Sequence, residues 1–197
     1  MAQAEAARDD GIEAVAIVTP NHVHAPASKA FLAQGIHVIC DKPLTATMED
    51  AVSLEQAVAE SAALFVLTHN YTGYPLVRHA RDMIARGDLG AIRVVQAEYT
   101  QEWLTETIED SGQKQASWRT DPARSGGGGA IGDIGTHAFN LLSFVTGLGT
   151  EALCADLHSF GAGRQVDDNA HIMLRLENGA RGMLWASQVA VGRENAL

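Results

Sequence analysis

The stretch that decides the fold is Ser125-Gly126-Gly127-Gly128-Gly129-Ala130-Ile131-Gly132-Asp133-Ile134-Gly135-Thr136-His137. Four consecutive glycines allow the backbone to approach a ligand or another segment without a side chain in between. Apolar residues then recur at three-and-four spacing up to Gly147, which predicts a helix closed by a glycine cap. Asp133 and His137 are four residues apart, so a helix that has already begun places them one turn apart on one face. A carboxylate beside an imidazole is a common way to fix a tautomer and create a proton acceptor.

Two plainer interpretations of this stretch stay open. In the first, Asp133 caps the helix and His137 is an ordinary helix histidine with its hydrogen bonds satisfied. In the second, the run is a dinucleotide fingerprint, because Gly127, Gly129 and Gly132 match G-x-G-x-x-G. We reject the second interpretation, because the preceding segment 118–124 is polar and interrupted by a proline, whereas the fingerprint follows a buried strand.

Composition narrows the class of protein. The chain has 197 residues, of which 46% are hydrophobic, enough for one large or two small globular domains. Asp and Glu outnumber Lys and Arg by 24 to 14, and the net charge of −10 argues against nucleic acid or an anionic membrane surface as a partner. Two distant cysteines, Cys40 and Cys154, suit a cytoplasmic protein without structural disulfides. Neither an apolar run of membrane-spanning length nor a secretory h-region is found.

Three short apolar segments alternate with helical patterns in the first third of the chain. This alternation predicts parallel strands with helical crossovers at residues 14–18, 36–40 and 64–67. We expect the first strand to be buried on both faces. Thr47 is expected to cap the second of these helices, with Asp50 three residues later. Ligands of open parallel sheets bind beyond the carboxyl ends of the strands. The polar residues expected to gather at that edge are Thr19, Asn21, His22, His24, Asp41, Lys42, His69 and Asn70.

The pattern changes after Gly73. Pro75 begins a helix that runs to Gly87, and residues 92–101 alternate as a strand does. Residues 102–124 predict a long irregular loop, suited to a lid or an interface arm. Strand-like segments follow at 152–160, 169–176 and 180–190, and Asn178-Gly179 is a strong hairpin signal. The predicted fold class is therefore α/β: a Rossmann-type half sheet over 1–72, then an α+β domain with a mainly antiparallel sheet over 73–197.

Several motifs, taken together and in this order, resemble the Gfo/Idh/MocA family of NAD(P)-dependent oxidoreductases, and the resemblance covers nearly the whole chain. Thr19-Pro20-Asn21-x-x-His24 resembles the family's loop near the nicotinamide. Asp41-Lys42-Pro43 resembles its Glu-Lys-Pro motif, with Asp in place of Glu. His69-Asn70-Tyr71 and the Gly-rich run ending in Asp133-x-x-x-His137 follow in the expected order.

The resemblance also implies segments that this sequence lacks. The opening strand, the glycine-rich turn that cradles the cofactor diphosphate and the acidic residue for the ribose are absent before Asp10. We therefore expect the chain to be a fragment of such an enzyme, shortened at the N-terminus and, at Leu197, at the C-terminus. On this basis residues 1–72 are a partial nucleotide-binding domain, and residues 73–197 are an incomplete domain for substrate binding and oligomerisation.

The implied reaction is hydride transfer between NAD or NADP and a secondary alcohol of a sugar, polyol or related compound. His137 is the expected proton acceptor, Asp133 orients it, and Lys42 donates to the substrate oxygen. Residues expected near the cofactor are Thr19, Pro20, Asn21, His24, Asp41, Lys42 and Asn70. Residues expected near the substrate are Lys42, Asn70, Trp118, Arg119, Asp133 and His137. A homo-oligomer through the C-terminal sheet is a further implication.

Two other functions remain as alternatives. Without the diphosphate turn, the chain could be a non-catalytic binding or scaffold protein that keeps the fold. A zinc hydrolase built on His22, His24 and Asp133 is the other, although the spacing of further zinc ligands does not favour it, and no metal is expected. The residues Asp167-Asp168-Asn169 are interpreted as a turn before a strand.

Overall fold

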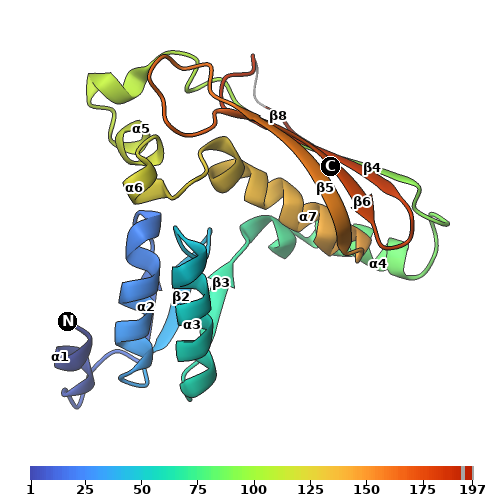
Figure 1. Cartoon of the computed structure of the whole chain (residues 1–197). Coiled ribbons are helices and arrows are strands. Elements are labelled where there is room, and N and C mark those ends of the chain that lie inside the picture. Colours follow the sequence, from blue (N-terminus) through green and yellow to red (C-terminus); the bar gives the residue numbers. More distant parts are fainter. Residues whose placement is uncertain (192–193, 197) are drawn as a thin grey trace. The chain divides into compact units, whose positions relative to one another are not determined.

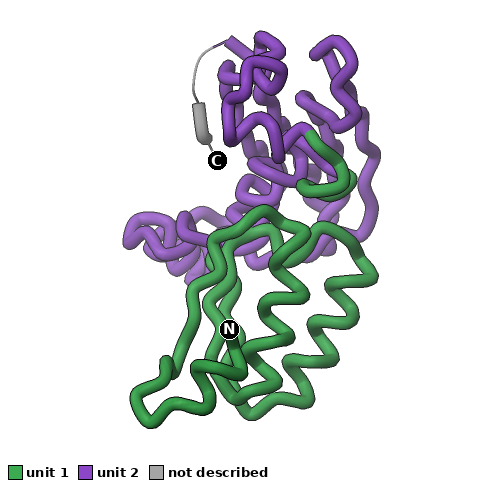
Figure 2. Tube along the Cα trace, turned by 90° about the vertical axis from the view of Figure 1, so that its left-hand side faces the viewer, with its two compact units in different colours: residues 1–68, 121–127 green, residues 69–120, 128–197 purple. Residues whose placement is uncertain are grey.

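The computed structural model describes residues 1–191 and 194–196. The chain divides into two compact units, Met1–Thr68 with Asp121–Gly127, and His69–Thr120 with Gly128–Leu197 (Figure 2). In the first unit, the segment 121–127 is held to distant residues by hydrogen bonds: the Asn21 side-chain amide donates to the Ser125 carbonyl oxygen at 2.8 Å. No helix in the described part of the chain is both long and apolar enough to cross a bilayer.

The first unit contains a three-stranded parallel sheet in the order β1-β2-β3, as predicted. Its strands are β1 (Ala14–Ile17), β2 (His37–Asp41) and β3 (Phe65–Thr68) (Figure 1). Its helices are α1 (Ala2–Ala6), η1 (Asn21–Val23), α2 (His24–Leu32), α3 (Met48–Glu60) and α6 (Pro122–Ser125). The predicted cap of α3 is confirmed, because the Thr47 hydroxyl accepts the Asp50 backbone N–H at 3.1 Å.

The prediction that the first strand is buried on both faces is wrong. Val38 and Cys40 of β2 are fully buried against the helices, whereas Ile39 between them is 42% exposed. In β1, Ile17 is buried while Ala14 and Ala16 are exposed. Helices α2 and α3 pack on each other and share one core with the sheet, so in the described part of the chain only one face is covered. The sequence could not distinguish the two cases, because a short apolar run has the same composition whether helices cover one face of the sheet or both.

The second unit contains a five-stranded sheet in the order β5-β6-β7-β4-β8. It is mainly antiparallel, with one parallel pair between β4 and β7. Its strands are β4 (Val94–Thr100), β5 (Thr150–His158), β6 (Asn169–Leu176), β7 (Arg181–Ser187) and β8 (Glu194–Ala196). Its helical segments are η2 (Asn70–Gly73), α4 (Pro75–Ala85), η3 (Ile108–Ser111), α5 (Lys114–Arg119), η4 (Ile131–Gly135) and α7 (Thr136–Thr146) (Figure 1).

Helix α7 lies against one face of this sheet and forms its core. Leu142 of α7 and Leu184 of β7 are both fully buried there, and burying a leucine side chain contributes about 1.5–3 kcal/mol. The predicted ends of the helix and hairpin are confirmed: Gly147 closes α7 at a φ of +69°, and Gly179 turns the β6–β7 hairpin at +81°. The opposite face of the sheet has no helix over it in the described residues.

The predicted irregular loop at 102–124 is instead partly helical. It holds η3, α5 and α6, which are too short to show a helical period in the sequence. Their starting points are nevertheless set by side-chain caps: Gln113 Oε1 accepts the Ala116 backbone N–H at 2.7 Å, and Asp121 Oδ1 accepts the Ala123 backbone N–H at 2.9 Å.

The glycine run supports a matched pair of substitutions. A Cβ atom added at Gly129 would lie 2.0 Å from the backbone oxygen of Asp167, whereas one added at Gly127 would meet nothing within 4 Å. We expect Gly129→Ala to lower the free energy of unfolding by about 1–3 kcal/mol, because two backbone segments must separate. Gly127→Ala should change it by less than about 0.5 kcal/mol. Urea denaturation measures both, and equal effects would contradict the packing described.

Candidate active site

His24 joins the loops that follow β1 and β2 in the first unit. The side chain is 1% exposed, and its ring nitrogens lie 2.9 Å from the Thr19 carbonyl oxygen and 2.8 Å from the Pro43 carbonyl oxygen. The loops that carry Thr19 and Lys42 are therefore fixed to one another at the carboxyl ends of two parallel strands. Because both nitrogens face carbonyl oxygens, this ring has no lone pair directed at a metal ion, which counts against the zinc interpretation.

Lys42 directly follows β2, and its peptide bond to Pro43 is cis. Its side chain is half-buried. The preceding Asp41 accepts a hydrogen bond from the Thr68 hydroxyl at 2.6 Å, which ties the end of β2 to the end of β3. The Asp-Lys-Pro motif therefore has a defined position at the strand ends. Asp41, which stands where the family motif has glutamate, forms a hydrogen bond to the neighbouring strand.

The other residues predicted near the cofactor differ in exposure. Asn21 is buried and its amide nitrogen is used in the bond to Ser125. Thr19 and Asn70 are exposed, and Pro20 is half-buried. His22 is exposed and its Nδ1 lies 3.3 Å from the Arg124 carbonyl oxygen. Their proximity to a cofactor stays a prediction.

In the second unit, Asp167 binds the glycine run. Its carboxylate accepts the backbone N–H groups of Gly129 and Ile131, both at 2.8 Å. Its backbone oxygen accepts the Ala130 N–H at 2.8 Å. Burial raises the pKa of Asp167 above its usual value, although the two backbone donors act in the opposite direction. Three hydrogen bonds to Asp167 thus fix the backbone at the start of the helical turn that carries Asp133.

Asp168, the next residue, belongs to a buried ionic network. Its carboxylate accepts the N–H groups of Phe160 and Gly161 and an N–H of Arg164, the last at 2.7 Å. Arg164 also donates two bonds to Glu109, at 2.9 and 3.1 Å. The sequence predicts Asp167-Asp168-Asn169 as a turn before a strand, and β6 begins at Asn169. The sequence carries no signal for the hydrogen bonds of Asp167 to the glycine run.

Asp133 lies in η4 just before α7. Its Oδ2 accepts Arg119 Nε at 3.1 Å and Gln188 Nε2 at 2.9 Å. Helix α7 begins after Gly135 without a side-chain cap, so the interpretation of Asp133 as the helix cap is wrong. Arg119 in turn stacks over the Trp118 ring, with its guanidinium carbon 4.2 Å from the ring centroid. The structure therefore brings Trp118, Arg119 and Asp133, three of the residues predicted near the substrate, into contact.

His137 lies on the first turn of α7 within a cluster of rings. It is 8% exposed, and its ring centroid lies 4.8 Å from that of Tyr71 and 6.2 Å from those of Tyr99 and His69. The hydroxyl groups of Tyr71 and Tyr99 share a hydrogen bond of 2.9 Å. An imidazole within this aromatic wall is shielded from bulk water.

Tyr99 stays a neutral hydroxyl in this setting. Burial, the hydrogen bond and charge of Tyr71, and the charge of Asp133 all raise its pKa, and these effects exceed the opposing hydrogen bond with Gln101. Tyr99 and Gln188, both on the sheet side of the site, were missed by sequence reasoning. Tyr99 had a weak signal, because β4 alternates and Tyr99 is the one aromatic residue of that strand; Gln188 had none.

No group of three or more His, Cys, Asp or Glu residues arranged to hold a metal ion occurs among the described residues. The donor chemistry of the two units is instead that of hydroxyl, ammonium, imidazole and carboxylate groups at strand and helix ends.

Comparison with known proteins identifies the family of this chain. Residues 2–69 match the family described as the oxidoreductase family with an NAD-binding Rossmann fold, and residues 77–197 match the GFO/IDH/MocA C-terminal domain. The chain belongs to the GFO/IDH/MocA family, a family of NAD(P)-dependent oxidoreductases, and its α/β fold is the fold predicted.

Individual relatives extend over almost the whole chain. An oxidoreductase structure from Sinorhizobium meliloti is 58% identical with a TM-score of 0.84 and covers 98% of this chain and 50% of its own. An inositol dehydrogenase homologue from Azotobacter vinelandii, complexed with NAD+, is 36% identical with a TM-score of 0.92 and the same two coverages. Levoglucosan dehydrogenase from Pseudarthrobacter phenanthrenivorans is 32% identical over 96% of this chain and 53% of its own. The chain spans about half the length of the curated relatives it matches.

The ionic network of Asp168, Arg164 and Glu109 predicts that the stability of the fold depends on pH. Burial alone works against ionisation of Glu109, but the hydrogen bonds and charge of Arg164 outweigh it and hold the pKa of Glu109 below its usual range. Because the folded-state pKa is the lower one, ionised Glu109 stabilises the fold fully above the unfolded-state pKa, and this stabilisation is lost as the pH falls through the folded-state pKa.

We therefore expect Glu109→Gln to lower the free energy of unfolding by about 1–3 kcal/mol at pH 7. The difference from the parent protein should shrink as the pH falls below the ordinary glutamate pKa of about 4.3. Denaturation at a series of pH values measures it, with Glu55→Gln on the exposed surface of α3 as the control. A difference that is constant with pH would show that Glu109 contributes nothing through its charge.

Proposed function

We propose that this protein is an NAD(P)-dependent oxidoreductase that transfers hydride between the nicotinamide and a secondary alcohol of a sugar, polyol or related compound. The observation that carries the proposal is the environment of His137. Its imidazole lies inside a wall of aromatic rings, four residues after a carboxylate that Arg119 and Gln188 hold in place. These surroundings support the assignment of His137 as the proton acceptor.

The residues of the first unit fit the nicotinamide end of the cofactor. The loops after β1 and β2 present the Thr19 hydroxyl and the Lys42 ammonium at the carboxyl ends of parallel strands, and His24 fixes these loops. The turn after β1 contains Thr19 and Pro20 rather than glycines, so the fit does not extend to a diphosphate cradle. When bound, the cofactor supplies the hydride acceptor or donor; either NAD or NADP is compatible with these loops.

The chain's own residues would supply proton transfer, stabilisation of charge and exclusion of water. His137 accepts the proton of the substrate hydroxyl as the C–H hydride leaves, and Asp133 orients the imidazole and favours its charged form. Lys42 donates a hydrogen bond to the same oxygen and stabilises its developing negative charge. Tyr71 and Tyr99 exclude water from the imidazole. The roles of Asn21, Asp41, Asn70, Trp118 and Arg119 are to position cofactor and substrate.

The substrate class rests on the relatives. Levoglucosan dehydrogenase and the inositol dehydrogenase homologue are both named for compounds rich in hydroxyl groups. By the same analogy, residues 1–72 form part of a nucleotide-binding domain, and residues 73–197 form a domain for substrate binding and association into a homo-oligomer through the sheet. A cytoplasmic location, expected from the two free cysteines, is part of the same proposal.

The test combines binding and turnover. NADH and NADPH are titrated into the 197-residue chain while nicotinamide fluorescence is followed, and oxidation of a panel of polyols and sugars is then measured. We expect nicotinamide binding, and we expect His137→Asn to reduce turnover by about 10²–10⁴-fold while leaving the nicotinamide dissociation constant within a few-fold of the parent value. Lys42→Ala should likewise reduce turnover far more than binding.

The alternative of a non-catalytic scaffold makes the opposite prediction. It requires that neither nucleotide changes its fluorescence on addition of the chain and that no alcohol is oxidised. A variant of Tyr74, an exposed ring of the same segment, serves as the matched control: Tyr74→Phe should leave both measurements unchanged. Equal loss of turnover in His137→Asn and Tyr74→Phe would contradict the assignment of His137 as proton acceptor.

A further inference from the structure

Gln188 lies directly after β7 and is deeply buried in the second unit, with a side chain that is 1% exposed. Its side-chain Nε2 donates to Asp133 Oδ2 at 2.9 Å. Its backbone N–H donates to the Asp168 carbonyl oxygen at 2.8 Å, and its own carbonyl oxygen accepts the Leu104 backbone N–H at 3.0 Å. One residue therefore connects the helical turn of Asp133 to two segments that are distant from it in the sequence.

These hydrogen bonds close a path that begins and ends at Asp133. In one direction, the path runs through Gln188 to Asp168. In the other direction, the Asp133 backbone N–H donates to the Gly129 carbonyl oxygen at 2.9 Å, and the Asp167 carboxylate accepts the Gly129 N–H at 2.8 Å. Because Asp167 and Asp168 are neighbours in the chain, Asp133 is held by its side chain and by its backbone at once.

The third contact of Gln188 leads to the segment that carries Arg119. Leu104 in this segment is 1% exposed, and Arg164 donates to its carbonyl oxygen at 3.2 Å. Farther along the segment, Arg119 Nε donates to Asp133 Oδ2 at 3.1 Å. The two donors to Oδ2 of Asp133, Gln188 and Arg119, therefore come from segments that are joined through the backbone of Leu104.

The two donors differ in charge. Arg119 is a permanent cation, and its guanidinium carbon lies 4.2 Å from the ring centroid of Trp118. Gln188 donates a hydrogen bond without carrying a charge. A second cation at this place would offset the negative charge of Asp133, and this charge favours a protonated imidazole at His137. A buried amide therefore orients the carboxylate and leaves its charge in place.

Titratable groups from several elements of the second unit lie around Asp133. They are Arg119 of α5, Tyr99 of β4 and His137 of α7, and the carboxylate of Asp167 binds the backbone at the start of the same turn. Burial is the main cause that raises the pKa of Tyr99, and the charge of Asp133 adds to it. Tyr99 therefore stays neutral, and Asp133 and Arg119 form an ion pair.

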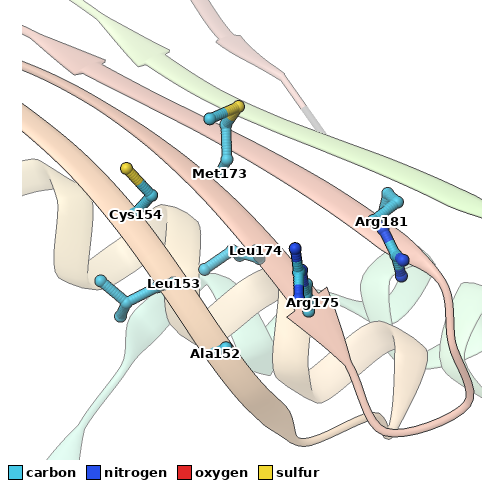
Figure 3. Close-up of a pocket in the computed structure, with 7 residues that line it drawn as sticks. All are labelled: Ala152, Leu153, Cys154, Met173, Leu174, Arg175 and Arg181. Atoms are coloured by element: carbon cyan, nitrogen blue, oxygen red, sulfur yellow. The ribbon is translucent and has the colours of Figure 1, made fainter.

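Strands β6 and β7 also pack against η4. Alternate residues of both strands point to the core, so Arg175, Arg181 and His171 point to the opposite face of the sheet. Figure 3 shows the two arginines there, at a hollow of about 470 Å³. These three side chains are therefore separated from Asp133 by the sheet.

We propose that Gln188 is a positioning residue for hydride transfer: its amide fixes the carboxylate of Asp133, and Asp133 in turn orients His137. The backbone of Gln188 ties this carboxylate to the segment of Arg119 and to the turn that binds the glycine run. The part of the proposal that concerns the reaction rests on the proposed function, whereas the contact with Asp133 does not require the chain to be catalytic.

Gln188→Glu tests the contact. The introduced carboxyl has nearly the size of the amide, but it donates a hydrogen bond only while it is protonated. Burial and the charge of Asp133 both raise its pKa in the folded state, so the variant should be as stable as the parent near pH 4 and lose stability as the pH rises above the unfolded-state glutamate pKa of about 4.3. We expect its urea midpoint at pH 7 to lie about 0.5–1 M below that of the parent. Tryptophan fluorescence gives the midpoint, because all three tryptophans belong to the second unit.

A double variant, Asp133→Asn with Gln188→Glu, reverses the donor and the acceptor. The introduced amide can donate to the introduced carboxylate, so we expect the urea midpoint at pH 7 to recover most of the loss. Turnover should stay as low as in Asp133→Asn alone, because no carboxylate then lies four residues before His137. Recovery of stability without recovery of turnover separates the contact from its effect on the reaction.

Turnover of single variants tests the positioning role. Gln188→Met keeps the volume of the side chain but removes the donor, and it should reduce turnover by about 10–100-fold at every pH while the nicotinamide dissociation constant stays within a few-fold of the parent value. Gln188→Glu should instead lose turnover progressively as the pH rises, because its protonated form still donates to Asp133. Gln34→Glu, on the exposed surface after α2, is the control and should change neither stability nor turnover.

Three outcomes would overturn the proposal: a Gln188→Glu variant with the parent midpoint at both pH 4 and pH 7, a double variant no more stable than Gln188→Glu alone, or parental turnover in Gln188→Met. A parent chain without turnover would contradict the proposed function. The two stability measurements would then still support or overturn the contact between Gln188 and Asp133, because they need neither cofactor nor substrate.

Discussion

The second unit depends on the contact between Asp167 and the glycine run. One carboxylate and one backbone oxygen bind three consecutive positions, Gly129, Ala130 and Ile131, at hydrogen-bond distance. The contact requires a glycine, because any Cβ at position 129 would enter the backbone of Asp167. The contact also has a cost in free energy, because the half-buried carboxylate of Asp167 is held by backbone donors and, among the described residues, has no ion pair with a cation. The residue after Asp167 is also fixed, because Asp168 belongs to the ionic network with Arg164 and Glu109.

This contact sets the geometry of the site because the helical segment after the glycine run is rigid. The helical turn η4 begins at Ile131, just after the four glycines, and leads directly into α7, whose core face is packed on the sheet. Asp133 and His137 thus have positions determined by backbone hydrogen bonds and core packing rather than by a loop. Side chains from other elements complete the surroundings: Arg119 from α5, Gln188 after β7, and the two tyrosines from η2 and β4.

Sequence reasoning succeeded where one local signal determines the structure. Alternation of strand and helix patterns identified the parallel sheet, Thr47 identified a helix start, and Asn178-Gly179 identified a hairpin. It failed where the determinant is distant in sequence. Whether Ala14 and Ala16 are covered depends on a second helical layer that an apolar run does not report. The helices within 102–124 are shorter than two turns, so no hydrophobic period repeats in them. The partners of Asp133 are 14 and 55 residues away, and no spacing rule connects them.

The most direct test of the account is a crystal structure of the chain with an oxidised nicotinamide cofactor and a polyol. The account predicts that a carbinol oxygen lies about 2.6–3.2 Å from a ring nitrogen of His137, that the Lys42 ammonium contacts the same oxygen, and that Arg119 and Gln188 still hold Asp133. A polyol bound with its hydroxyl groups directed away from the imidazole, or a cofactor whose nicotinamide lies away from the loops after β1 and β2, would contradict it.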